Sequence, residues 1–107
     1  MRVFEYLDRN GRSPFASWFK SLDARAAAKV TVALGRVAGG NFAHPKSLGG
    51  GVSEIRIDWG PGYRIHFGRE GTEIVILLAG GTKQRQQDDI ALARNRWQDH
   101  MRRKKEA

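Results

Sequence analysis

The sequence predicts an α+β domain in which helices cover one face of an antiparallel sheet. Three observations support this fold class. Residues 14–22 and 24–38 carry apolar side chains at helical spacing, residues 52–79 contain three strand-like segments separated by glycine turns, and residues 84–103 return to helical spacing. A length of 107 residues suits one modest core. We therefore expect residues 1–107 to form a single domain that ends in a short basic tail over residues 102–107.

The elements of the N-terminal half have their own start and stop signals. Residues 2–7 (RVFEYL) are typical of a short strand. Ser13 is a suitable N-cap, and Pro14 follows at the first helical position, where the missing N–H costs nothing. Asp23 is expected to cap a second helix, which ends at the glycines 39–40. The first strand therefore leads into an antiparallel helical pair.

The C-terminal half changes to strand periodicity. Residues 41–51 contain a proline and three consecutive glycines, which predicts a loop. Residues 52–58 and 63–69 alternate apolar and polar side chains around a Gly-Pro-Gly turn, and residues 73–79 are almost continuously apolar. This pattern indicates a three-stranded meander that ends in a central strand. The last helix is expected to bury Ile90, Ala93, Trp97 and Met101.

Composition limits the class of function. The chain has 19 Lys and Arg against 11 Asp and Glu, giving a formal charge of +8, which favours a polyanionic or acidic partner. There is no cysteine, which excludes disulfides and thiolate zinc sites, and the three histidines lack metal-ligand spacing. No apolar run is long enough for a bilayer, and Glu5 and Asp8 interrupt any signal peptide. We expect a cytoplasmic protein without a bound metal or cofactor and without a membrane partner.

The hairpin over residues 52–69 allows two registers that keep its isoleucines on the core face. In one, Arg56 lies opposite Arg64 and Glu54 opposite His66. In the other, Arg56 lies opposite His66 and Asp58 opposite Arg64. Both place the charged residues on one exposed face. We favour the first register, because a phosphate between two opposed guanidinium groups would relieve a repulsion that is otherwise destabilising.

Such a face has the groups needed to cleave RNA, which supplies its own nucleophile in the 2′-OH. The reaction needs a base, charge that stabilises the phosphorane, and an acid for the leaving 5′-oxygen. Arginine suits the second role. Glu54 or His66 is the candidate base, and Lys83 or protonated His66 the candidate acid. A plain phosphate-binding surface is the alternative. Contacts to RNA are expected from Lys46, Tyr63 and Arg85.

The segments SPFASWFKSL, LGRVAGGNFAHPKSLGGGVSEIRIDWGPGYRIHF and LLAGGTKQRQQDDIALAR together resemble the HigB-like addiction-module killer group of RelE/ParE toxins. The resemblance runs from the first strand to the last helix. It implies a RelE/ParE-like fold, pairing with an antitoxin that is often of the helix-turn-helix type, and cleavage of messenger RNA on the ribosome.

The resemblance also implies roles for individual residues. Arg56 corresponds to a substrate-contacting basic residue, Arg64 to the arginine that stabilises the reacting phosphate, and Lys83 to a basic residue near the scissile bond. Lys46 falls in a loop where the family often has another basic residue. Glu54 stands where some members have a lysine proposed as the base.

Three functions remain open at the level of sequence. The first is a metal-independent, ribosome-dependent endoribonuclease, which the set Arg56, Arg64 and Lys83 favours. The second is a toxin that inhibits DNA gyrase, as in the other branch of the superfamily. The third is a non-catalytic nucleic-acid-binding subunit of a toxin–antitoxin repressor complex.

Overall fold

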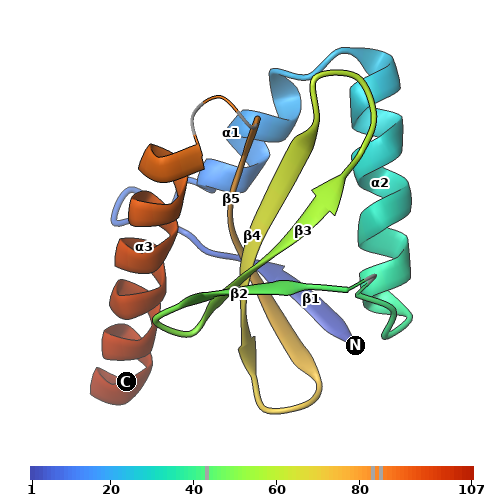
Figure 1. Cartoon of the computed structure of the whole chain (residues 1–107). Helices are drawn as coiled ribbons and strands as arrows, with labels where there is room; N and C mark the ends of the chain where they lie inside the picture. Colours follow the sequence, from blue (N-terminus) through green and yellow to red (C-terminus); the bar gives the residue numbers. More distant parts are fainter. Residues whose placement is uncertain (43, 83, 85) are drawn as a thin grey trace.

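The computed structural model describes residues 1–42, 44–82, 84 and 86–107, and Figure 1 shows the arrangement of its elements. In chain order these are β1 (Arg2–Glu5), α1 (Pro14–Lys20), α2 (Ala24–Ala38), β2 (Lys46–Gly49), β3 (Val52–Ile57), β4 (Tyr63–Glu70), β5 (Ile74–Thr82) and α3 (Gln86–Glu106).

The five strands form one mixed sheet in the order β1-β5-β4-β3-β2. Strands β2 to β5 form an antiparallel meander, and β1 pairs with β5 in parallel. The predicted α+β class is confirmed. The parallel β1–β5 pair differs from the expected antiparallel sheet. From β1 at one edge of the sheet the chain passes through α1 and α2 to β2 at the opposite edge, and the meander then brings it back to β5, beside β1.

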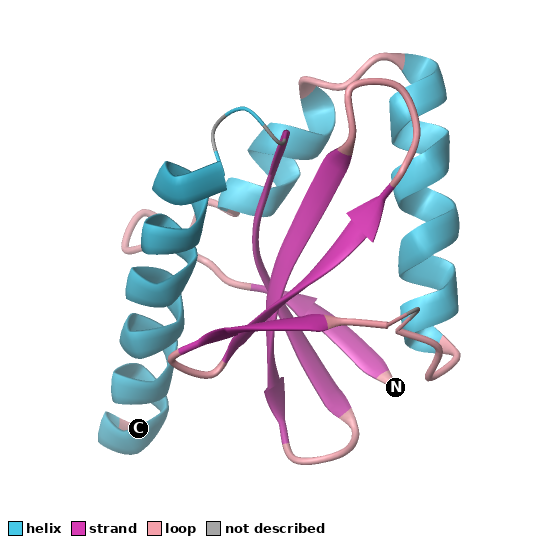
Figure 2. Ribbon diagram, in the orientation of Figure 1, coloured by secondary structure: helices cyan, strands magenta, loops and turns pink. Residues whose placement is uncertain are grey.

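The helices cover both faces of the sheet rather than one, so this part of the prediction is wrong. Figure 2 shows α3 on one side of the strands and α2 on the other. On the first face α1 and α2 pack over a core that includes Phe15, Val30 and Ile65. On the second face Trp97 and Ala93 of α3 pack on another apolar cluster. A strand as apolar as β5 has to be covered on both faces, which explains the third layer.

The helix caps agree with the sequence. The Ser13 hydroxyl accepts a hydrogen bond from the Ala16 amide, and the Asp23 carboxylate accepts one from the Ala26 amide. Both contacts satisfy amides that the first helical turn leaves without intrahelical partners. Pro14 occupies the first position of α1, as predicted.

Three local predictions differ from the structure. Residues 46–49 form the edge strand β2 inside the segment expected to be a loop. Met101 on α3 is 43% exposed and does not join the core. The expected tail is helical to Glu106, and Arg103 and Lys104 pair with Asp99 and Glu70. Within the described residues, no helix is long and apolar enough to cross a membrane.

Candidate functional site

The hairpin of β3 and β4 has the register that the sequence analysis favoured. Arg56 lies directly opposite Arg64, and Glu54 lies opposite His66. The neighbouring strands extend these pairs into two rows. Lys46 of β2 lies opposite Glu54 at the end of one row, and Gly81 of β5 lies opposite Arg64 at the end of the other. Residues opposite one another in a sheet share a face, so this geometry places the predicted charged set together.

The shared face is only partly open to solvent, which corrects the expected exposure. Glu54 and His66 are completely buried, and the Arg64 side chain is 11% exposed. Arg56 remains exposed. The reason is tertiary: α3 packs across this face of the sheet, where the indole of Trp97 fills the space above Gly68. The charged face is therefore exposed on the Arg56 side and closed on the His66 side.

A buried ion pair fixes the side chain of Arg64. Its guanidinium nitrogen Nη1 donates to Oε1 of Glu54 at 2.6 Å, and the Glu54 side chain has no exposed surface. A carboxylate removed from water interacts strongly with a neighbouring cation, because little solvent screens the pair. Glu54 thus neutralises one of the two opposed arginines and offsets the repulsion that this register would otherwise create.

His66 lies behind this pair. Its Nε2 is 3.6 Å from Oε2 of Glu54, and burial lowers the pKa of the imidazole, an effect that the charges of Glu54 and Asp89 oppose. Burial disfavours the charged form of histidine. The structure therefore favours a neutral imidazole beside the buried carboxylate.

A small hollow opens where the two arginines meet. It has a volume of about 120 Å³ and is lined by Arg56, Ile57, Asp58, Gly62, Tyr63 and Arg64. Pockets for whole small molecules usually hold about 300–1,000 Å³, so this hollow suits a single charged group. Arg56 and Arg64 both line it, and a guanidinium provides the forked donors that match phosphate oxygens.

Of the remaining predicted residues, Tyr63 lines this hollow and Lys46 does not. Lys46 is exposed on β2. Tyr63 is buried, and its ring contacts Trp18 edge-on and Trp59 in a stacked arrangement, both with centroids 6.3 Å apart. Tyr63 therefore forms a wall of the hollow and has little ring surface for a base. The predicted Lys83 and Arg85 lie outside the described residues.

Comparison with known proteins now places the chain in a family. Residues 17–98, from within α1 to most of α3, match the model of the phage-derived Gp49-like proteins (DUF891). This chain belongs to the Gp49-like family. It is also similar to an uncharacterized protein of Haemophilus influenzae, with 42% identity over 81 residues that cover 75% of this chain and 82% of the relative.

Gp49-like proteins are toxins of type II toxin–antitoxin systems with a RelE/ParE-like fold, which implies a cognate antitoxin as partner. The three-layer arrangement described above agrees with that fold.

One residue of this Gp49-like site was missed by the sequence analysis. The carboxylate of Asp89, at the start of α3, lies so close to Gly81 that any side chain at that position would collide with it. Its charge also acts on the neighbouring His66. The sequence signal is the glycine pair 80–81, which had been interpreted as a strand end; Gly81 instead leaves room for Asp89 of α3, and Gly80 leaves room for Trp18 of α1. Within the described residues no cluster of three metal-ligating side chains is found.

Proposed function

We propose that this Gp49-like toxin is a HigB-like endoribonuclease that cuts messenger RNA on the translating ribosome in the cytoplasm. The observation that carries the proposal is the pair of opposed arginines, of which Arg64 is fixed by the buried Glu54 and Arg56 is exposed. An anion held between them would interact with one preorganised and one adaptable guanidinium.

The proposed reaction uses the 2′-OH of the substrate. Its oxygen attacks the adjacent phosphorus as its proton passes to a water molecule, the bond to the 5′-oxygen breaks, and a 2′,3′-cyclic phosphate remains. The phosphorane carries more negative charge than the starting diester, so a guanidinium already in place stabilises it more than it stabilises the bound substrate. Arg64 has this role in the proposal, and Arg56 binds the same phosphate from the open side.

The burial of Glu54 and His66 assigns them a supporting part. Neither has exposed surface from which to touch a 2′-OH, while both lie against Arg64 or against each other. We therefore infer that they orient Arg64 and set the charge around it. Proton transfer to the leaving 5′-oxygen is proposed for Lys83, in keeping with the resemblance to HigB-like toxins.

The partner is proposed to be a helix-turn-helix antitoxin. An antitoxin with an acidic surface would complement the basic face of the toxin and steer association. Coexpression of the toxin with its neighbouring reading frame should therefore give a complex that is stable in gel filtration. Elution of the toxin alone, with the neighbouring protein present and soluble, would contradict this partner.

The function is tested by adding the purified toxin to a cell-free translation reaction and mapping mRNA ends by primer extension. We expect new ends that require ribosomes and that disappear when Arg64 is replaced. A DNA gyrase supercoiling assay runs in parallel. Loss of supercoiling without new mRNA ends would overturn the proposal in favour of a gyrase inhibitor, and neither effect would favour a non-catalytic binding subunit.

A further inference from the structure

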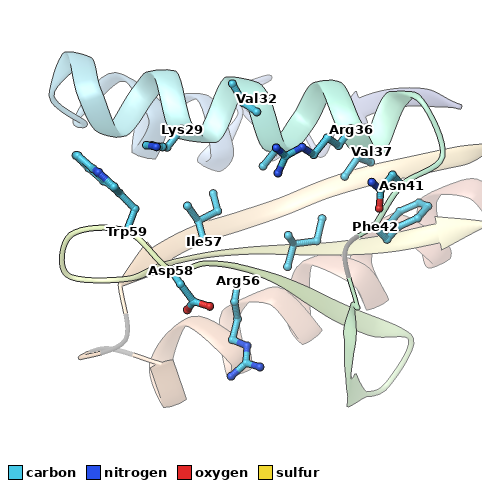
Figure 3. Close-up of a pocket in the computed structure, with 12 residues that line it drawn as sticks. Lys29, Val32, Arg36, Val37, Asn41, Phe42, Arg56, Ile57, Asp58 and Trp59 are labelled. Atoms are coloured by element: carbon cyan, nitrogen blue, oxygen red, sulfur yellow. The ribbon is translucent and has the colours of Figure 1, made fainter.

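A second, larger hollow lies between α2 and β3, on the other side of the strand from the Arg64 side chain. Figure 3 shows this groove, with Lys29, Arg36 and Val37 on the helix above and Ile57, Asp58 and Trp59 on the strand and turn below. Its volume is about 310 Å³, at the lower end of the usual range of about 300–1,000 Å³ for ligand pockets. Size alone therefore allows a ligand of the size of a nucleotide.

The groove continues into the phosphate-sized hollow around the edge of β3. Arg56, Ile57 and Asp58 line both cavities. The edge of β3 is open here, since β2 pairs with it no further than Glu54 among the described residues. A bound linear polymer that passes Arg56 can thus occupy both cavities without crossing another strand or helix.

The lining of the groove combines cations with apolar surface. Lys29 and Arg36 are exposed on α2, and within the described part of the chain neither forms a salt bridge. Asp58 is the one acidic residue in the lining, and Figure 3 shows its carboxylate pointing away from α2. Aromatic rings stand toward the two ends of the groove, Trp59 with Lys29 above its ring and Phe42 stacked on Phe67.

This combination fits unpaired RNA. Single-stranded RNA presents phosphates at regular intervals and bases whose faces pack on apolar and aromatic side chains. An acidic peptide would also meet the charges, but the continuity with the arginine hollow favours the polymer whose phosphate occupies that hollow. We propose that the groove between α2 and β3 is a second RNA-binding site, which holds the nucleotides next to the scissile phosphate through Lys29 and Arg36.

The inference rests on the proposed function, and it is tested by binding rather than by cleavage. Fluorescein-labelled 2′-O-methyl RNA, which cannot be cleaved, is titrated as a trimer and as an octamer by fluorescence anisotropy. The test variant is Lys29→Gln/Arg36→Gln. The matched control is Arg9→Gln/Arg12→Gln, which removes the same charge from an exposed loop outside both cavities.

We expect the test variant to bind the octamer about tenfold more weakly than wild type and to lose clearly less affinity for the trimer, because a trimer with one phosphate at the arginines has only one further internucleotide phosphate to place in the groove. The salt dependence of octamer binding should fall by about 1.4 in log–log slope, the value for two lost phosphate contacts on a single strand. The control should change both affinities by less than about twofold. Circular dichroism verifies that both variants are folded.

An octamer affinity that is equal in wild type and test variant overturns the proposal. Equal octamer affinity together with groove-dependent binding of a synthetic glutamate–valine peptide would also overturn it and would assign the groove to a protein partner. The mRNA cleavage assay separates this inference from the proposed function. A wild-type protein that does not cleave mRNA but shows the groove-dependent length effect would retain the RNA site while the nuclease proposal fails.

Discussion

The carboxylate of Glu54 holds the guanidinium of Arg64 at 2.6 Å across the β3–β4 hairpin, and no part of the Glu54 side chain reaches solvent. Arg56, directly opposite Arg64, is exposed and forms no salt bridge among the described residues. Two arginines that face each other in the same row are therefore in different physical states. One is fixed and partly neutralised, and the other is free to bind.

Arg64→Ala is expected to lower the single-turnover rate of ribosome-bound mRNA cleavage by about 10² or more, with little change in binding, because Arg64 stabilises charge that develops in the transition state. Arg56→Ala should lower the rate less. Rapid-quench measurements at saturating toxin test both. A folded Arg64→Ala protein that cleaves at the wild-type rate would remove Arg64 from the mechanism.

The two substitutions should also differ in stability. Arg64→Ala leaves the buried Glu54 carboxylate without its cation, a change that costs about 3–5 kcal/mol in typical buried pairs. Arg56→Ala removes an exposed side chain and should change the free energy of unfolding by less than about 0.5 kcal/mol. Urea unfolding followed by circular dichroism measures both, and it also gives the folded fraction needed to correct the rates. Equal stabilities would contradict the buried ion pair.

Glu54→Gln tests whether Glu54 acts through Arg64. The amide keeps the size of the side chain but removes the charge that fixes the guanidinium, so the cleavage rate should fall. In the Arg64→Ala background the same substitution should have almost no further effect on the rate, because the group that it orients is gone. Single-turnover rates of the two single variants and the double variant form the cycle. Additive losses would show that Glu54 contributes independently of Arg64.

Stability should depend on pH through His66. Burial lowers its pKa in the folded protein below the value of about 6.5 in the unfolded chain. Between these two values the unfolded state binds more protons, so stability is fully present above about pH 6.5 and declines as the pH falls toward the folded pKa.

His66→Gln should flatten the decline in melting temperature between about pH 7 and 5.5. The groups facing His66 are Glu54, Arg64 and Asp89, and all three remain in the variant. An unchanged slope would show that folding does not shift the pKa of His66.

The packing of α3 on the sheet is tested by substituting glycines. A Cβ at Gly68 would overlap the six-membered ring of Trp97, so Gly68→Ala should displace the indole and lower stability by about 1–3 kcal/mol. Gly35, in the last turn of α2, has no atom near the place of a Cβ, and Gly35→Ala should raise stability by up to about 1 kcal/mol. Thermal unfolding and tryptophan fluorescence measure the two effects. If Gly68→Ala were as stable as wild type, the close packing of α3 on β4 would be wrong.

Short-range rules in the sequence predicted much of the local structure of this protein. The Gly-Pro-Gly turn and the alternation on either side of it limited the hairpin to two registers, and the expected relief of the repulsion between two arginines by a phosphate favoured the one in which Arg56 lies opposite Arg64, as observed. Ser13 and Asp23 marked the starts of two helices in the same way. These predictions succeeded because turn geometry and side-chain periodicity are set by residues that are close together in the chain.

The position of α3 was decided only by the tertiary structure. Periodicity identifies the apolar side of a helix, but it does not say which face of a distant sheet that side will cover. The charged face of the hairpin was therefore expected to be open, whereas Trp97 lies against Gly68 and Asp89 against Gly81 on that face. As a result Glu54 and His66 are buried, and two expected surface residues support Arg64 from within. The groove between α2 and β3 has the same origin, because its walls are separated in sequence and come together only when α2 packs on the sheet.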